Sequence, residues 1–159
     1  MDIVSTQKRS EMMSKIGAKN TKPEIIILKL LHSEGYRFRL HLKRLPGKPD
    51  IALQKHNTLI FVNGCFWHGH SCDIFRLPKS RTEFWRTKID SNKERDKRNF
   101  ESLRRLGWRI LVIWECALKG KNRLSQDKIV KLLNHWFESD IAEAYITAEG
   151  LEVLSETPP

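Results

Sequence analysis

Cysteine is scarce in this chain: its 159 residues include only three. An odd number of cysteines argues against a closed disulfide framework of the kind that holds small secreted domains together. The chain also lacks any apolar run approaching the roughly 20 residues that a membrane-spanning helix needs. Residues 1–15 contain no apolar core of a signal peptide. These absences predict a cytoplasmic protein without a membrane partner.

Acidic residues are outnumbered, because 29 Lys and Arg stand against 19 Asp and Glu, for a formal net charge of +10 and a pI near 9.7. A pI above about 9 is typical of proteins that bind polyanions, although a merely soluble basic protein has the same charge. Hydrophobic residues, at 40%, exclude a disordered chain. Residues 1–20 are polar and basic without apolar periodicity. We expect a flexible or ligand-ordered arm there, and a single domain with its own core over residues 21–159.

Apolar periodicity and turn residues predict alternating helices and strands. A capping box at Thr21-Lys22-Pro23-Glu24 opens a helix that Gly35 ends. Residues 108–114 form the most apolar run, which is typical of a central buried strand. The other predicted elements are strands at 36–42, 50–53 and 58–62, a helix at 83–106 in one piece or two, a helix at 125–137, and a hairpin from residue 144. This order predicts a mixed α/β fold, with helices flanking a central sheet.

Cysteines and histidines gather in one short segment after the predicted strand at 58–62. Cys65, His70 and Cys72 lie within eight residues, and Cys116 comes just after the predicted central strand. Three thiolates and one imidazole suit a tetrahedral structural zinc ion. The alternative is a set of ordinary buried thiols with a surface histidine. If all four bind zinc, no open coordination position remains, and the additional His68 is free for chemistry.

The same segment carries Phe66 and Trp67, two large aromatic side chains in a loop. Adjacent rings in a ligand-bearing loop are difficult to bury together. Basic charge, a zinc-type motif and exposed aromatic rings together point to nucleic acid as the partner.

A second candidate site begins at Asp50, which follows Pro49 at the start of a predicted strand. A carboxylate in this place, with another strand about ten residues later, is the layout of nucleases that bind Mg²⁺ beside the scissile phosphate. A turn-capping role is the alternative. The usual second element, Asp/Glu-x-Lys, is absent, since the matching place reads Val62-Asn63-Gly64. His68 could serve as general base or general acid, whereas Glu24 is explained equally well by the capping box.

Several segments of the chain resemble one family. They are Leu45-Pro46-Gly47-Lys48-Pro49-Asp50, Gly64-Cys65-Phe66-Trp67-His68-Gly69-His70, Arg81-Thr82-Glu83-Phe84-Trp85, Gly107-Trp108-Arg109 and Trp114-Glu115-Cys116. In one register from about Arg9 to Lys121, they closely resemble the very-short-patch-repair (Vsr) mismatch endonucleases. The resemblance implies a fold like that of the type II restriction endonucleases, with a built-in zinc site.

The resemblance also implies an activity. The implied activity is that of a bacterial, nucleoid-associated enzyme that nicks one strand of double-stranded DNA 5′ to the thymine of a T:G mismatch. Such a mismatch arises when 5-methylcytosine deaminates. A partner methyltransferase and downstream mismatch-repair proteins are implied in the same way. We expect the enzyme to act as a monomer.

The same resemblance implies a role for each candidate residue. Asp50 and the backbone carbonyl of Val62 would bind Mg²⁺. His68, supported by Glu24, would act in acid–base chemistry near the attacking water. The zinc ligands would be Cys65, His70, Cys72 and Cys116.

Recognition of DNA is implied for two further groups of residues. The rings of Phe66, Trp67 and Trp85 would wedge into the base stack beside the mismatch, where unstacking costs less than in a matched duplex. For Trp85 alone, a place in the core of its helix is the alternative. The cations of the arm would clamp phosphates and make binding depend on salt; they are Lys8, Arg9, Lys15 and Lys19.

One position departs from the family. Asn63 stands where its members usually carry a histidine, close to the scissile phosphate. Asn can donate a hydrogen bond but cannot carry a positive charge or transfer a proton at neutral pH. We still expect an active enzyme, with a rate, metal–water network or leaving-group step affected at this position. Two alternatives stay open: a related nuclease with a different mismatch or site specificity, and a non-catalytic zinc module that binds distorted DNA.

Overall fold

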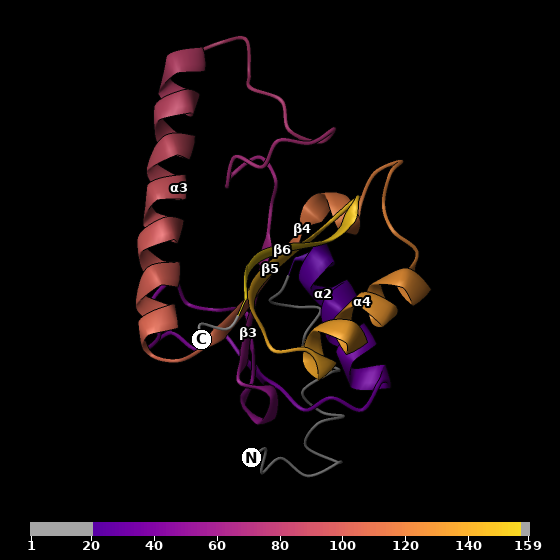
Figure 1. The fold of residues 1–159 in the computed structure, drawn as a ribbon. Helices are drawn as coiled ribbons and strands as arrows, with labels where there is room; N and C mark the ends of the chain where they lie inside the picture. The colour runs from indigo at the N-terminus through magenta and orange to yellow at the C-terminus, as the bar shows by residue number, and fades with distance from the viewer. Residues whose placement is uncertain (1–20, 157–159) are drawn as a thin grey trace.

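A six-stranded mixed sheet forms the centre of the computed structural model, which describes residues 21–156 (Figure 1). The strands lie in chain order and are β1 (Arg39–Leu40), β2 (Ile51–Leu53), β3 (Thr58–Asn63), β4 (Arg109–Trp114), β5 (Ile141–Thr147) and β6 (Gly150–Glu156). The β3–β4 and β4–β5 pairs are parallel, and the other pairs are antiparallel. The expected mixed α/β class is therefore confirmed. The arm cations Lys8, Arg9, Lys15 and Lys19 lie outside the described residues.

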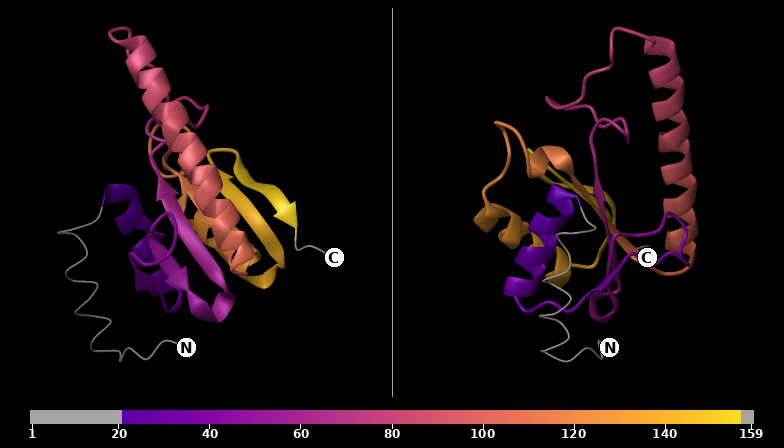
Figure 2. Two further views of the ribbon diagram at one scale, coloured as in Figure 1. Left: turned by 90° about the vertical axis from the view of Figure 1, so that its left-hand side faces the viewer. Right: turned by 180° about the vertical axis from the view of Figure 1, so that it is seen from behind.

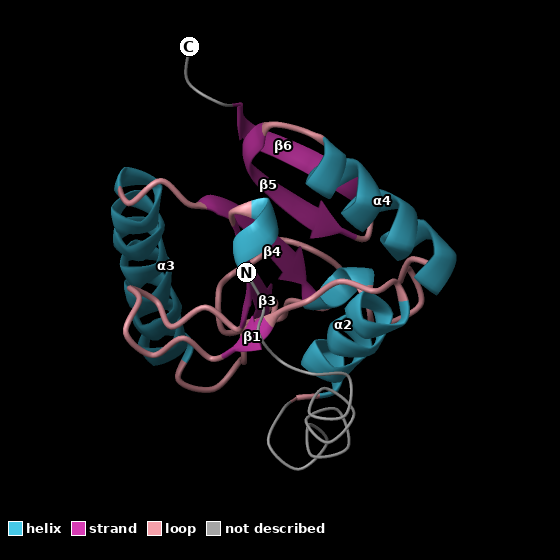
Figure 3. Ribbon diagram, turned by 90° about the horizontal axis from the view of Figure 1, so that it is seen from below, coloured by secondary structure: helices cyan, strands magenta, loops and turns pink. Residues whose placement is uncertain are grey.

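Helices cover both faces of the sheet. Helices α2 (Lys22–Ser33) and α4 (Gln126–Glu138) pack on one face, and α3 (Thr82–Arg105) lies on the other (Figures 1 and 3). Two short 3₁₀ turns, η1 (Gln54–His56) and η2 (Glu115–Ala117), follow β2 and β4. No helix in the described part of the chain is long and apolar enough to cross a membrane.

Strand β4 shows why the sheet is covered on both sides. Because successive side chains of a strand point to opposite faces, Ile110 and Val112 pack in the core beneath α3, whereas Leu111 and Ile113 pack in the core beneath α2 and α4. All four are fully buried. A strand buried on both faces has to be apolar throughout, so the prediction of a central buried strand is confirmed.

The two parallel crossovers have opposite hands. The chain passes from β3 through α3 to β4, and from β4 through α4 to β5, while the strand order runs in one direction. Since α3 and α4 lie on opposite faces, one of the two connections departs from the usual right-handed form. Among the described helices, α3 alone covers its face, and the loop at 64–81 runs beside it (Figure 2).

Some element boundaries differ from the predicted ones. The strand expected at 36–42 is reduced to Arg39–Leu40, and it ends there because His41 has a left-handed backbone (φ +49°) that cannot continue an extended chain. The charged helix is a single helix over Thr82–Arg105 and not two, and Gly107 with φ +93° follows it. The terminal hairpin begins at Ile141, before the predicted residue 144.

Candidate active site and metal centre

The sheet topology brings two of the three cysteines together. Strands β3 and β4 are parallel neighbours, with Asn63 opposite Trp114 at their ends. Two residues beyond each of these positions stand Cys65 and Cys116, so both emerge at the same edge of the sheet. A hydrogen bond from the backbone N–H of Cys65 to the carboxylate of Glu115, at 3.2 Å, fixes the two strand ends to each other.

The loop after β3 supplies the other two members of the cluster. His70 Nδ1 lies 3.7 Å from the Sγ of Cys65 and 3.7 Å from the Sγ of Cys116. With Cys72 included, the four candidate ligand atoms all lie within 4.8 Å of one another. Tetrahedral Zn–S and Zn–N bonds of about 2.3 and 2.0 Å place sulfur and nitrogen about 3.6 Å apart, so these spacings fit such an ion.

Burial determines the charge of this cluster. It raises the pKa of the Cys65 and Cys116 thiols and lowers the pKa of His70. Without a metal, burial therefore favours the uncharged forms of Cys65, Cys116 and His70. The His70 ring stacks on the indole of Trp114, with centroids 4.4 Å apart, and this contact holds its Nδ1 toward the thiols. The donor set could hold a metal ion of the zinc type.

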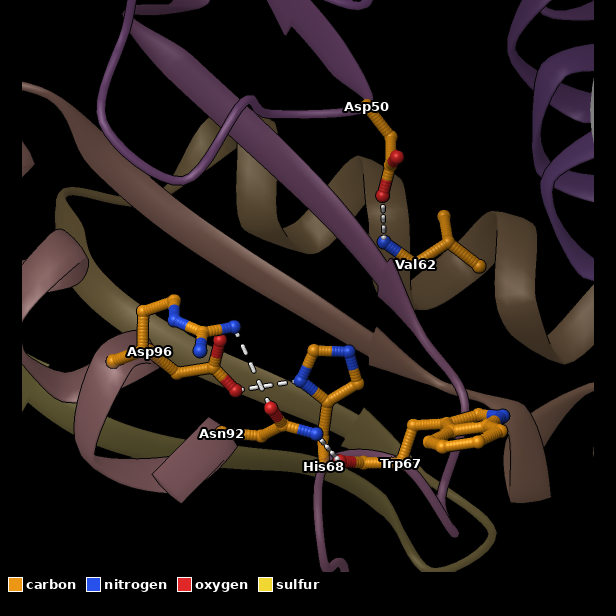
Figure 4. Close-up of polar contacts among 7 residues, drawn as sticks. Asp50, Val62, Trp67, His68, Asn92 and Asp96 are labelled. Atoms are coloured by element: carbon orange, nitrogen blue, oxygen red, sulfur yellow. Dashed lines mark hydrogen bonds and ion pairs between the residues drawn. The ribbon is translucent and has the colours of Figure 1, made fainter. Parts of the chain in front are cut away.

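Asp50 lies immediately before β2, in a largely buried position beside β3. Its Oδ2 accepts a hydrogen bond of 2.8 Å from the backbone N–H of Val62 (Figure 4). In a strand, the N–H and C=O of one residue point to the same side, so the carbonyl of Val62 also faces this carboxylate. Burial raises the pKa of Asp50 from 3.8 to about 6. The structure thus brings Asp50 and Val62 together, and their binding of Mg²⁺ stays a prediction.

Two more side chains converge on Asp50. Glu24, in the first turn of α2, and His41, just after β1, place ligand atoms within 4.8 Å of each other and of Asp50. Burial raises the pKa of Glu24. The backbone N–H of Glu24 donates to Thr21 Oγ1 at 3.5 Å, so the predicted N-cap is present as well. His41 was missed in the sequence analysis, because the alternating pattern at 36–42 indicated only a strand.

His68 lies in the loop after β3 and is held by α3. Its Nδ1 lies 2.6 Å from a carboxylate oxygen of Asp96, and the side-chain amide of Asn92 donates to the carbonyl of Trp67 at 2.9 Å (Figure 4). Gly69 completes this contact: at φ +66°, a Cβ there would lie 2.7 Å from Ile89 of α3, so only glycine lets the loop approach the helix. Asp96 and Asn92 were not predicted, since nothing in the sequence separates them from the other charged and polar residues of this helix.

Asn63 and His68 line one cavity of about 300 Å³ on the α3 side of the sheet. The two carboxylates that line this cavity, Asp96 and Glu143, are paired with His68 and Arg104. Lys93 and Lys97 of α3 therefore leave the lining with an excess of positive charge, which suits an anionic group. Asn63 itself is almost fully buried at the end of β3. Burial raises the pKa of Asp50, and the charges of His41 and His68 act in the opposite direction.

An aromatic cluster adjoins His68. The rings of Phe66, Trp67 and Trp85 contact one another, with centroids between 5.1 and 5.8 Å apart. Trp67 is 50% exposed, and Trp85 is half-buried in this cluster and not in the core of α3. Phe75 and Phe84, which the sequence analysis did not single out, extend the cluster at either side. The loop therefore presents a group of rings to solvent directly beside a titratable imidazole.

The chain is similar to known DNA endonucleases. Residues 1–74 match the family described as DNA mismatch endonuclease Vsr. Over 154 residues the chain is 39% identical to the DNA mismatch endonuclease Vsr of Escherichia coli, covering 97% of this chain and 99% of that protein. It is 50% identical over 120 residues to the type II nicking enzyme V.NmeAIP of Neisseria meningitidis, covering 76% of this chain and 86% of the relative. It is also 50% identical over 123 residues to the type II nicking enzyme V.XorIIP of Xanthomonas oryzae, covering 77% and 90%.

Proposed function

The chain belongs to the Vsr family of DNA mismatch endonucleases, and from that membership we propose that it nicks one strand of duplex DNA 5′ to the thymine of a T:G mismatch. Such mismatches arise from deamination of 5-methylcytosine, and the nick would initiate very short patch repair. One observation supports this most directly: the exposed ring of Trp67 and the Asp96-bound imidazole of His68 are adjacent in one loop. A ring inserted into the base stack beside the mismatch would therefore bring His68 to the neighbouring phosphate.

Two metal ions fit the donor sets described above. Cys65, His70, Cys72 and Cys116 would hold a structural Zn²⁺, because all four ligand positions are filled by protein. Asp50, with the carbonyl of Val62 and support from Glu24, would hold a catalytic Mg²⁺, since these groups offer oxygen donors. When bound, such an ion polarises the phosphate and stabilises the charge that develops on it.

His68 is arranged to take a proton from water. With Nδ1 directed to the carboxylate of Asp96, the proton of the neutral ring stays on Nδ1, and Nε2 carries the free lone pair. Water deprotonated by Nε2 attacks the phosphorus in line with the departing 3′ oxygen, which leaves as the P–O bond breaks and takes a proton from solvent. The products are a 5′-phosphate and a 3′-hydroxyl. Asn63, on the same cavity, can orient the phosphate by hydrogen bonding but transfers no proton.

The first prediction concerns the substrate. With Mg²⁺, the protein should nick labelled duplexes carrying a T:G mismatch, only on the thymine strand and only 5′ to that base, and leave matched duplexes intact. A denaturing gel of both end-labelled strands measures this directly.

The same gel separates the alternatives. Nicking of another mismatch or of an ordinary site would show that the protein is a related nuclease with a different specificity. The relatives named only as type II nicking enzymes favour this possibility. Mismatch-selective binding without a nick under any divalent ion would make the protein a DNA-distortion binder.

The second prediction concerns Asp96. Asp96→Asn should lower the single-turnover rate by about 10- to 100-fold. A neutral amide neither holds the proton on Nδ1 of His68 nor orients the ring as firmly as the carboxylate does. DNA affinity should be unchanged, as judged by fluorescence anisotropy. Asp90→Asn, an exposed carboxylate on the same helix, is the matched control. Equal rates for Asp96→Asn and Asp90→Asn would exclude the proposed pairing from catalysis.

A further inference from the structure

The side chains around Asp50 include a nitrogen donor that the proposed Mg²⁺ chemistry does not use. Nε2 of His41 lies 3.9 Å from a carboxylate oxygen of Glu24, and the candidate ligand atoms of Glu24, His41 and Asp50 all lie within 4.8 Å of one another. Two donors, each about 2.1 Å from one ion, are about 3 to 4 Å apart. The three side chains could therefore close on one cation with shifts below about 1 Å.

The backbone directs His41 into this position. Its φ of +49° is in the left-handed region, which non-glycine residues seldom adopt and which recurs at functional sites. Its N–H donates to the backbone carbonyl of Asp50 at 3.0 Å, so the backbones of the two residues are locked together. The turn that ends β1 after Leu40 thereby delivers an imidazole to the carboxylates, whereas an extended residue would have continued the strand.

The surroundings favour a cation at this point. Glu24 and Asp50 are two carboxylates brought together in a partly buried place, with their ligand atoms within 4.8 Å of each other. His41 is the imidazole facing them, and its side chain is 41% exposed, so an ion can reach the cluster from solvent. The combination of two oxygen donors and one nitrogen donor differs from the all-oxygen shell that Mg²⁺ prefers.

We propose that His41 is a ligand of the active-site cation, together with Asp50 and Glu24, and that it lets the site bind Mn²⁺ or Co²⁺ more tightly than its oxygen donors alone would, beside the Mg²⁺ proposed above. The inference rests on the proposed function, since it takes the place beside Asp50 as the site of the catalytic ion. Imidazole binds Mn²⁺ and the later divalent ions of the first transition row, whereas Mg²⁺ is held by carboxylate, carbonyl and water. His41 would therefore raise the affinity of the site for Mn²⁺ much more than its affinity for Mg²⁺.

The test measures ion binding and not activity. Mn²⁺ is titrated into the zinc-loaded protein without DNA, and free Mn²⁺ is followed by electron paramagnetic resonance. Wild type is compared with His41→Gln and with the control His135→Gln, which removes an exposed imidazole on α4. Mg²⁺ affinity is obtained by competition against bound Mn²⁺.

His41→Gln should weaken Mn²⁺ binding at least about tenfold, since even groups beyond the ligands change metal affinity on this scale. Mg²⁺ binding should change much less, and His135→Gln should match wild type for both ions. Equal Mn²⁺ affinity of wild type and His41→Gln would overturn the proposal, as would an equal loss for both ions, or no Mn²⁺ binding to wild type. Absence of nicking by wild type with every ion, alongside His41-dependent Mn²⁺ binding, would refute the proposed function and leave the ligand assignment standing.

Discussion

Asp50→Asn should abolish nicking and, at the same time, raise the melting temperature of the protein in the absence of added divalent ions. The loss of activity follows from the loss of a charged oxygen ligand, which should lower the single-turnover rate by at least about a thousandfold. The gain in stability has a different cause. In the folded chain, burial holds the pKa of Asp50 at about 6, above its ordinary value of 3.8.

The direction of the pH dependence follows from this shift. Because the folded-state pKa is the higher one, the folded state binds the proton more tightly than the unfolded state. Asp50 is therefore harmless below pH 3.8, where both states are protonated, and it destabilises the fold as the pH rises through about 6. About two pKa units correspond to roughly 3 kcal/mol, and residual solvation reduces this to about 1–3 kcal/mol at neutral pH.

Asn removes this charge and keeps the acceptor, since its Oδ1 can still receive the N–H of Val62. Melting curves of wild type and Asp50→Asn at about pH 8 should differ by several degrees, and the gap should shrink near pH 5 as the wild-type carboxyl takes up its proton. Asp90→Asn, on the exposed face of α3, controls for loss of a surface charge. A lower melting temperature for Asp50→Asn at about pH 8 would contradict the account.

Cys116→Ser should strongly damage the cluster formed by Cys65, His70, Cys72 and Cys116. Cys116 follows the central strand directly and is almost fully buried, and its Sγ lies 3.7 Å from His70 Nδ1. Zinc in small domains contributes on the order of 10 kcal/mol of apparent folding free energy. Since a whole domain is stable by only about 5–15 kcal/mol, weakening this site should unfold the chain or lower its melting temperature by tens of degrees.

Metal analysis and circular dichroism check this prediction together. Wild type should carry bound zinc, and Cys116→Ser should lose most of it along with its cooperative melting. Ser71→Ala, a change in the same loop at an exposed residue outside the donor set, should retain both. Cys72→Ser should fall between them, because Cys72 is only half-buried and nearby water can replace its thiolate. Absence of zinc from wild type, with unchanged melting in Cys116→Ser, would show that the cluster is a set of ordinary buried thiols.

The parts of this molecule that could be predicted from sequence are those set by local pattern. The apolar run at 108–114 predicts a buried strand, because a strand covered on both faces needs apolar side chains on both and cannot alternate between apolar and polar residues. The cluster of Cys65, His70, Cys72 and Cys116 was predicted from residue type, and the parallel pairing of β3 with β4 explains why the distant Cys116 joins it. Asp50 was a candidate because of its place at a strand start, and the structure brings it next to Val62, Glu24 and His41.

The parts that escaped prediction depend on which side of an element faces the site. Asp96 lies 28 positions from His68 in a helix dense in charge, and only the packing of the loop on α3 distinguishes it from its neighbours. His41 escaped for a backbone reason. A left-handed residue inside an alternating segment leaves no mark on the hydrophobic pattern, yet it ends β1 and turns the imidazole toward Glu24 and Asp50.

The contacts of the loop with α3 have a consequence for fidelity. Asn92 holds the backbone of Trp67 and Asp96 holds the ring of His68, on successive turns of one helix. The group that would probe the duplex and the group that would activate water are thus parts of one rigid body. If a duplex does not let the Trp67 ring enter its base stack, the His68 imidazole also stays away from the phosphate, because the two groups move together. Such an enzyme would discriminate between matched and mismatched duplexes at the cleavage step and not at binding. A matched site could therefore be bound without being cut.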